Sequence, residues 1–78
     1  MYCETLQDLS PGKKATVTQL NLYGGKRRRL LDLGFQPGSE LTCLQRASGG
    51  SPTVFLVRGT RIALRKSDCE NILVNADA

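Results

Sequence analysis

The chain is a series of short apolar runs separated by turn residues, and most of the runs repeat at every second position. Residues 14–20 (KATVTQL) place Ala15 and Val17 on one face, with threonines on the other. Residues 40–46 (ELTCLQR) alternate in the same way, with Cys43 on the apolar face. A two-residue period with β-branched side chains is typical of half-buried strands, so both segments are predicted to be strands.

The second half of the chain predicts a hairpin and a final strand. Residues 53–57 (TVFLV) and 61–65 (RIALR) are strand-like runs separated by a short connection. Gly59 in this connection can adopt a positive φ, which tight hairpin turns require. Residues 72–74 (ILV) form the last apolar run. These segments bring the predicted strands to about five.

One segment has helical spacing. Within residues 26–33 (KRRRLLDL), Leu30 and the leucine three positions later share one face, while the charged residues can face solvent. Gly34 stands where a glycine in the left-handed conformation ends a helix, and Phe35 can supply the apolar contact that accompanies such an end. The glycine pair at residues 24–25 predicts a loop before this helix.

Two short helical turns and a loop complete the pattern. Thr5 followed by Asp8, and Ser67 followed by Glu70, have the spacing of a capping box, in which the first residue caps a helical turn. Residues 47–51 (ASGGS) are followed by a proline and predict a flexible loop.

Strands with a single helix inserted between the first and second predict a mainly β fold, a small closed barrel. Closure removes the exposed sheet edges that so short a chain would struggle to cover. An SH3-like barrel fits best, and an OB-type barrel is the alternative, although OB folds usually place their helix between the third and fourth strands. A chain of 78 residues buries only about 60% of its surface on folding, so we expect a single domain over residues 1–78.

The composition argues against catalysis. Histidine is absent, which removes the side chain that most often acts as a general base near neutral pH, and the imidazole ligand of metal sites with it. The closest carboxylates, Asp68 and Glu70, fall in the second short helical turn. We therefore interpret the chain as a binding module, not an enzyme, and expect no cofactor.

The three cysteines, Cys3, Cys43 and Cys69, are far apart and odd in number. Disulfide frameworks and structural zinc sites show paired or closely spaced cysteines, so neither is predicted and no metal site is expected. Cys43 and Cys69 are interpreted as small buried apolar residues. The alternative for Cys69 is a reactive or metal-binding thiolate, because a helix N-terminus can lower the pKa of a thiol.

Four consecutive cations, residues 26–29 (KRRR), dominate a chain with a formal net charge of +4 and an isoelectric point near 9.3. They can form a solvated helix face, a patch for an acidic partner or an anionic membrane surface, or a nucleic-acid site. Four cations give a salt slope of only about −3.6, and the chain has no tryptophan and few rings to stack bases. A protein partner is therefore favoured, and a small basic regulator associated with nucleic acid or a metal-dependent repressor is the alternative.

The sequence shows no signal for the membrane. No apolar run approaches the roughly 20 residues that a spanning helix requires, and the start MYCETLQDLS lacks the basic and apolar regions of a secretory signal. We expect a cytoplasmic protein without direct membrane insertion, and its oligomeric state is left open.

Motifs are spread over nearly the whole chain. L-x-x-L-x-P-G occupies residues 6–12, R-L-x-D-L-G-F-x-P-G residues 29–38, A-L-R residues 63–65 and I-x-V residues 72–74. In their order and spacing these motifs resemble the FeoA family, small cytosolic accessory proteins of bacterial ferrous iron transport.

The resemblance implies an SH3-like barrel that binds FeoB, a membrane iron transporter with a cytosolic GTP-binding domain. The resemblance also implies transition metal ion binding at the level of the family, but this chain has no cluster of ligand residues for it. The motif residues are interpreted as structural, with Arg29 able to pair with Asp32; they are Arg29, Leu30, Asp32, Leu33, Gly34, Phe35, Pro37, Gly38, Arg58, Gly59, Ala63, Leu64 and Arg65.

The partner contact is predicted by position. We hypothesise that it combines the cations of the helix with the loop after the second strand, namely Lys26, Arg27, Arg28, Ser48, Gly49, Gly50 and Ser51. Docking there would alter the GTP cycle of FeoB or its assembly. Arg28 acting as an arginine finger on the GTPase site is one possibility, and passive docking is the other.

Overall fold

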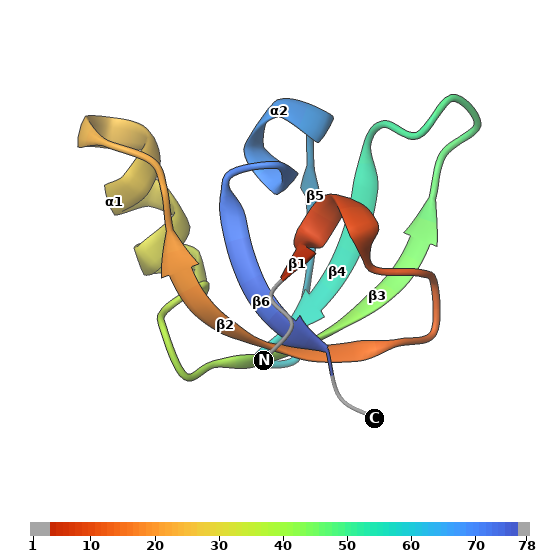
Figure 1. Ribbon diagram of the computed structural model, residues 1–78, viewed down its shortest axis with the longest axis horizontal. Helices are drawn as coiled ribbons and strands as arrows, with labels where there is room; N and C mark the ends of the chain where they lie inside the picture. The colour runs from red at the N-terminus through yellow and green to blue at the C-terminus, as the bar shows by residue number, and fades with distance from the viewer. Residues whose placement is uncertain (1–3, 77–78) are drawn as a thin grey trace.

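Six antiparallel strands form a single, strongly bent sheet in the computed structural model, which describes residues 4–76 (Figure 1). Their order along the sheet is β1-β6-β2-β3-β4-β5. The strands are β1 (Glu4–Thr5), β2 (Lys14–Leu20), β3 (Glu40–Arg46), β4 (Thr53–Val57), β5 (Thr60–Leu64) and β6 (Ile72–Ala76); the helices are η1 (Leu6–Asp8), α1 (Gly24–Leu33) and α2 (Lys66–Cys69). The mainly β prediction with one early helix is confirmed.

The two-residue strand β1 is an addition that the sequence pattern does not predict. It pairs with β6, where Glu4 lies opposite Val74 and Thr5 opposite Leu73. The turn that follows is the predicted one, because Thr5 donates from its backbone N–H to the Asp8 carboxylate at 3.3 Å and begins the 3-10 helix η1. The first and last described strands are therefore neighbours in the sheet.

A β-bulge in β2 decides which of its residues face the core. Ala15 and Val17 are buried, as predicted, but regular alternation from them would also bury Gln19 and expose Leu20. The pairing of β2 with β6 shifts register between Val17 and Gln19. An extra residue in one strand reverses the alternation beyond it, so Leu20 is buried and Gln19 is exposed.

Two phenylalanines form the centre of the core. Phe35, directly after α1, and Phe55, in β4, are fully buried, and their rings meet edge to face with centroids 6.4 Å apart. Such a pair contributes about 0.5–1.5 kcal/mol beyond the burial of its area. The buried apolar residues are Leu6, Leu9, Ala15, Val17, Leu20, Leu22, Leu30, Phe35, Leu41, Cys43, Phe55, Val57, Ile62, Leu64, Cys69, Ile72 and Val74.

The predicted hairpin is β4–β5, and its turn is tighter than expected. Val57 pairs with Thr60, so only Arg58 and Gly59 form the turn. Their φ angles are 52° and 76°, and two successive positive φ values define the type I′ turn that suits the twist of paired strands. β5 consequently begins at Thr60, one residue before the predicted start.

Helix α1 begins earlier and ends where predicted. Gly24 and Gly25 lie in its first turn, so the predicted loop at residues 24–25 is wrong. Gly24 has a φ of 62°, a conformation that glycine adopts without the steric penalty of a side chain. At the other end Gly34 has a φ of 112°, and the Phe35 N–H donates to the Leu30 carbonyl at 3.0 Å. The glycine stop is confirmed.

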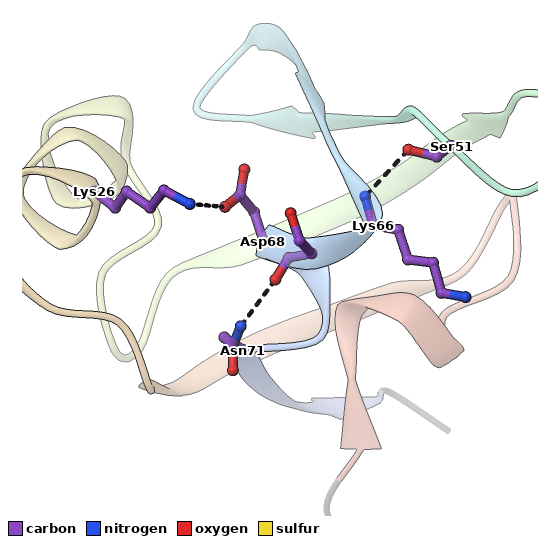
Figure 2. Close-up of polar contacts among 6 residues, drawn as sticks. Lys26, Ser51, Lys66, Asp68 and Asn71 are labelled. Atoms are coloured by element: carbon purple, nitrogen blue, oxygen red, sulfur yellow. Dashed lines mark hydrogen bonds and ion pairs between the residues drawn. The ribbon is translucent and has the colours of Figure 1, made fainter.

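Helix α2 is not capped by Ser67, so that prediction is wrong. The helix starts at Lys66, two residues earlier than a cap at Ser67 would give, and its N-cap residue Arg65 makes no side-chain capping bond. The Lys66 N–H instead donates to the hydroxyl oxygen of Ser51 at 3.1 Å, from the loop between β3 and β4 (Figure 2). Within residues 4–76, no helix is long and apolar enough to cross a membrane.

Candidate functional site

Helix α2 lies between the two segments that were predicted to contact a partner. On one side the Lys26 ammonium of α1 is 3.9 Å from the Asp68 carboxylate; on the other, Ser51 accepts the bond from Lys66 (Figure 2). The Asn71 side-chain amide donates to the Ser67 carbonyl at 2.8 Å and fixes the end of the turn. The loop and α1 therefore share one end of the molecule, with α2 connecting them (Figure 1).

A groove of about 390 Å³ runs between α1, β5 and α2. Its lining combines aliphatic side chains with basic and polar ones: Lys26, Arg29, Leu30, Leu33, Ile62, Ala63, Leu64, Arg65, Ser67 and Asp68. Three of these are cations and one is an acid, which is already paired with Lys26. Leu30, Ile62 and Leu64 are buried, whereas the three cations are exposed. The groove, which we call the α1–β5 groove, therefore has aliphatic side chains at its base and is net positive.

One stripe of α1 faces this groove. Lys26, Arg29, Leu30 and Leu33 are spaced i, i+3, i+4 and i+7, so they lie on the same side of a helix. Arg27 is exposed and does not line the groove. The helical period therefore divides the basic run, since two of its four cations face the groove and two face elsewhere.

Each predicted contact residue has a clear place. Lys26 lines the groove; Arg27 and Arg28 are exposed on other sides of α1; Ser48 and Gly49 are exposed in the loop; Gly50 is half-buried; and Ser51 caps α2. Whether these residues contact a partner stays a prediction. Among the described residues Arg29 and Asp32 form no ion pair, so the expected pairing is wrong.

Six motif residues that sequence reasoning interpreted as structural converge on the groove, namely Arg29, Leu30, Leu33, Ala63, Leu64 and Arg65. The remaining motif residues lie outside it: Asp32, Gly34, Phe35, Pro37, Gly38, Arg58 and Gly59. The sequence does contain one signal for the groove: the motifs R-L-x-D-L and A-L-R both place arginine next to leucine, the two residue types that line it. The two motifs are about 30 positions apart, and only the fold brings them together.

The two cysteines in the described part of the chain, Cys43 and Cys69, lie in the core. Cys43 and Cys69 are free and fully buried. Burial, together with the charge of Asp68, raises the pKa of the Cys69 thiol to about 11, against an ordinary value of 9.0; burial also raises the pKa of Cys43. Cys69 is the last residue of α2, and the C-terminal end of a helix presents no free N–H groups that could stabilise a thiolate. The interpretation of Cys69 as a buried apolar residue is therefore confirmed, and the thiolate alternative is wrong. Cys3 lies outside the described residues.

The part of the chain that the structure describes holds no group of three or more His, Cys, Asp or Glu side chains that could bind a metal ion. The α1–β5 groove contains one carboxylate, that of Asp68, among its aliphatic, basic and polar side chains.

The family model of the FeoA domain matches residues 4–76. This chain belongs to the FeoA family. FeoA domains are small accessory domains associated with ferrous iron transport.

Solved FeoA structures share the fold. The FeoA protein of Chlorobium tepidum is 34% identical, with a TM-score of 0.89 over 95% of this chain and 70% of that one. The FeoA of Stenotrophomonas maltophilia, solved with zinc and described as a procaryotic SH3 domain protein, is 33% identical, with a TM-score of 0.79 over 91% of this chain and 88% of that one. The predicted SH3-like barrel is confirmed. The expected full closure is wrong, because β1 and β5 end the strand order and do not pair with each other among the described residues.

A curated relative joins this domain to a transporter. The chain is 29% identical over 69 residues to a fusion of Fe(2+) transport protein A with the Fe(2+) transporter FeoB, from Porphyromonas gingivalis. The match covers 88% of this chain and 8% of the fusion protein, so this chain spans a small part of that relative's length.

Proposed function

We propose that this chain is a cytosolic accessory protein of ferrous iron transport that docks on the cytosolic, GTPase-containing part of a FeoB-type transporter. Docking modulates the activity of the transporter or its assembly. The observation that carries the proposal is the FeoA–FeoB fusion in P. gingivalis. Fusion holds two modules at an effective concentration that reaches the millimolar range with a short linker, and such tethering is useful when the modules act on one another.

The surface supports docking more than catalysis. The α1–β5 groove offers aliphatic side chains framed by Lys26, Arg29 and Arg65, a combination that suits an acidic amphipathic segment of another protein. Arg27 and Arg28 extend the positive charge beside it. The proposed contact therefore combines the groove with these two cations and the loop of residues 48–51.

The test is a binding measurement between the purified full chain and the FeoB-type transporter of the same organism, in the GDP-bound state and with a non-hydrolysable GTP analogue. We expect saturable binding in at least one nucleotide state, together with a change in GTP hydrolysis or in the size of the transporter assembly. Absence of binding in both states would overturn the proposal. Tighter binding to duplex DNA than to the transporter would support the regulator alternative instead.

A further inference from the structure

Strand β5 is one of the two edge strands of the sheet. It is the last strand in the order and has β4 as its only neighbour among residues 4–76. Because the hairpin turn has two residues, Val57 and Thr60 exchange a pair of hydrogen bonds, and every second pair along the ladder does the same. The pairs between these, Leu56 with Arg61 and Val54 with Ala63, do not.

The N–H and C=O groups of Arg61 and Ala63 consequently point away from β4. No backbone bond outside the β4–β5 ladder uses them within the described residues, and both residues are exposed. Arg61 and Ala63 thus offer four main-chain groups along an edge of about 17 Å, the length of a five-residue strand.

This open edge runs along the α1–β5 groove. Ile62, Ala63 and Leu64 of β5 line one wall of it, and the α1 stripe with Leu30 and Leu33 lines the other. Unpaired main-chain groups, an apolar base and a positive rim therefore meet in one place. Each of the three is a recognition element for a polypeptide in extended conformation.

We propose that β5 binds an acidic, extended segment of the partner, which adds a strand to the sheet and places alternate apolar side chains in the groove. The inference rests on the proposed function and names how that partner is held. An added strand lies about 4.8 Å from β5 and pairs with Arg61 and Ala63. A helix of about 10 Å diameter in the same groove would leave these groups without partners.

The positive charge around the groove favours an acidic segment over a second copy of this chain. Arg61 is exposed on β5 itself, and Lys26, Arg29 and Arg65 frame the groove. Side chains that alternate with the apolar ones on the added strand point to the opposite face of the sheet, so carboxylates there would lie beside Arg61. The cations that frame the groove favour an acidic segment as a whole. A second copy of this chain is disfavoured, because two β5 strands side by side would bring their arginines together in a protein of net charge +4.

The test combines a variant with a measurement on the unmodified chain. Ala63→Pro removes one outward N–H without taking a bond from the β4 ladder, since proline is accepted on edge strands. We expect about tenfold weaker binding to the FeoB-type transporter. The matched control is Ala63→Ser, which keeps the N–H at the same exposed position and is expected to bind as the unmodified chain does.

Amide hydrogen exchange on the unmodified chain gives a readout that does not depend on folding of a variant. On adding the transporter, we expect exchange at Arg61 and Ala63 to slow at least tenfold, while Ile62 and Leu64 are already protected in the free chain. Strand addition would be overturned if the transporter binds without slowing amide exchange at Arg61 and Ala63. It would also be overturned if the affinity of Ala63→Pro stays within twofold of that of the unmodified chain. Either result would leave the proposed function standing. Absence of any binding would overturn both, and concentration-dependent protection of β5 without the transporter would identify a second copy as the occupant.

Discussion

The guanidinium of Arg46 donates to the carbonyl oxygens of Gln7 and Leu9, each at 2.8 Å. Its Nε also donates to the hydroxyl of Thr53 at 3.2 Å, and Thr53 is the buried polar residue of β4. One side chain at the end of β3 thereby holds the segment around η1 against the sheet. This contact links positions 37 and 39 residues apart.

Arg46→Met is expected to lower the free energy of unfolding by about 2–4 kcal/mol, because half-buried carbonyl groups lose a charged donor. Arg46→Lys should recover part of the loss, since one ammonium cannot reproduce the planar fork. Urea unfolding followed by circular dichroism measures both. The exposed Arg27→Met is the control and should change stability by less than about 0.5 kcal/mol; an equal loss there would contradict the role given to Arg46.

The capping bond of α2 can be assigned by comparing two serines. Ser51→Ala should destabilise the protein by about 0.5–1 kcal/mol, since it removes the acceptor of the Lys66 N–H. Ser67→Ala should cost less than this, because Ser67 lies inside the helix and caps nothing. Thermal unfolding of the two variants separates them. A larger effect at Ser67 would restore the cap that the sequence predicts and contradict the structure.

Three glycine-to-alanine changes test different causes. At Gly34 an added Cβ would lie 3.0 Å from Val57 Cγ1, on a residue with a φ of 112°, so we expect a loss of about 2–4 kcal/mol. At Gly38 the φ is 93° but space is open, so only the backbone term of about 1 kcal/mol applies. At Gly25 neither applies, and alanine should stabilise α1 by about 0.5–1 kcal/mol. The order of the three melting temperatures is the check.

The buried thiol of Cys69 predicts a pH dependence. Its pKa is about 11 in the folded chain and ordinarily 9.0, so the unfolded chain loses the proton first as pH rises. The unfolded state therefore gains stability above pH 9, and the free energy of unfolding should fall between about pH 9 and 11. Cys69→Ala should flatten this fall, measured by urea unfolding at several pH values. Rapid alkylation of Cys69 in the native protein at pH 8 would argue against it.

The two sides of α1 can be distinguished by charge reversal. Arg29→Glu with Arg65→Glu changes cations at the groove, whereas Arg27→Glu with Arg28→Glu changes cations away from it. We expect the first pair to weaken transporter binding by tenfold or more and the second pair to weaken it less. Affinity measured at two salt concentrations checks that the loss is electrostatic. A greater loss from Arg27 and Arg28 would favour the contact that the sequence alone predicts.

The sequence pattern predicted those features that depend on residues close together in the chain. Alternation marked β2 and β3, and Gly34 with Phe35 marked the end of α1, because each depends on residues that are neighbours in the chain. Leu20 could not be placed by alternation, since the bulge arises from pairing with β6.

Contacts between segments far apart in the chain could not be predicted from the sequence, because they form only when the fold brings the segments together. Ser67 has the spacing of a cap, but Ser51 reaches the helix first from a loop 15 residues earlier. In the sequence Arg46 is only a polar residue at the end of a predicted strand; its hydrogen bonds to the carbonyls of Gln7 and Leu9 depend on the fold.

The pairing of β1 with β6 has a consequence for joining this domain to other polypeptides. Glu4 lies opposite Val74, so both ends of the described chain leave the sheet together, at the side of the molecule away from α2 (Figure 1). A linker attached at either end is therefore expected to start on the side opposite α2, which lines the α1–β5 groove. Joining this domain to another polypeptide at either end should then leave the groove accessible to a partner.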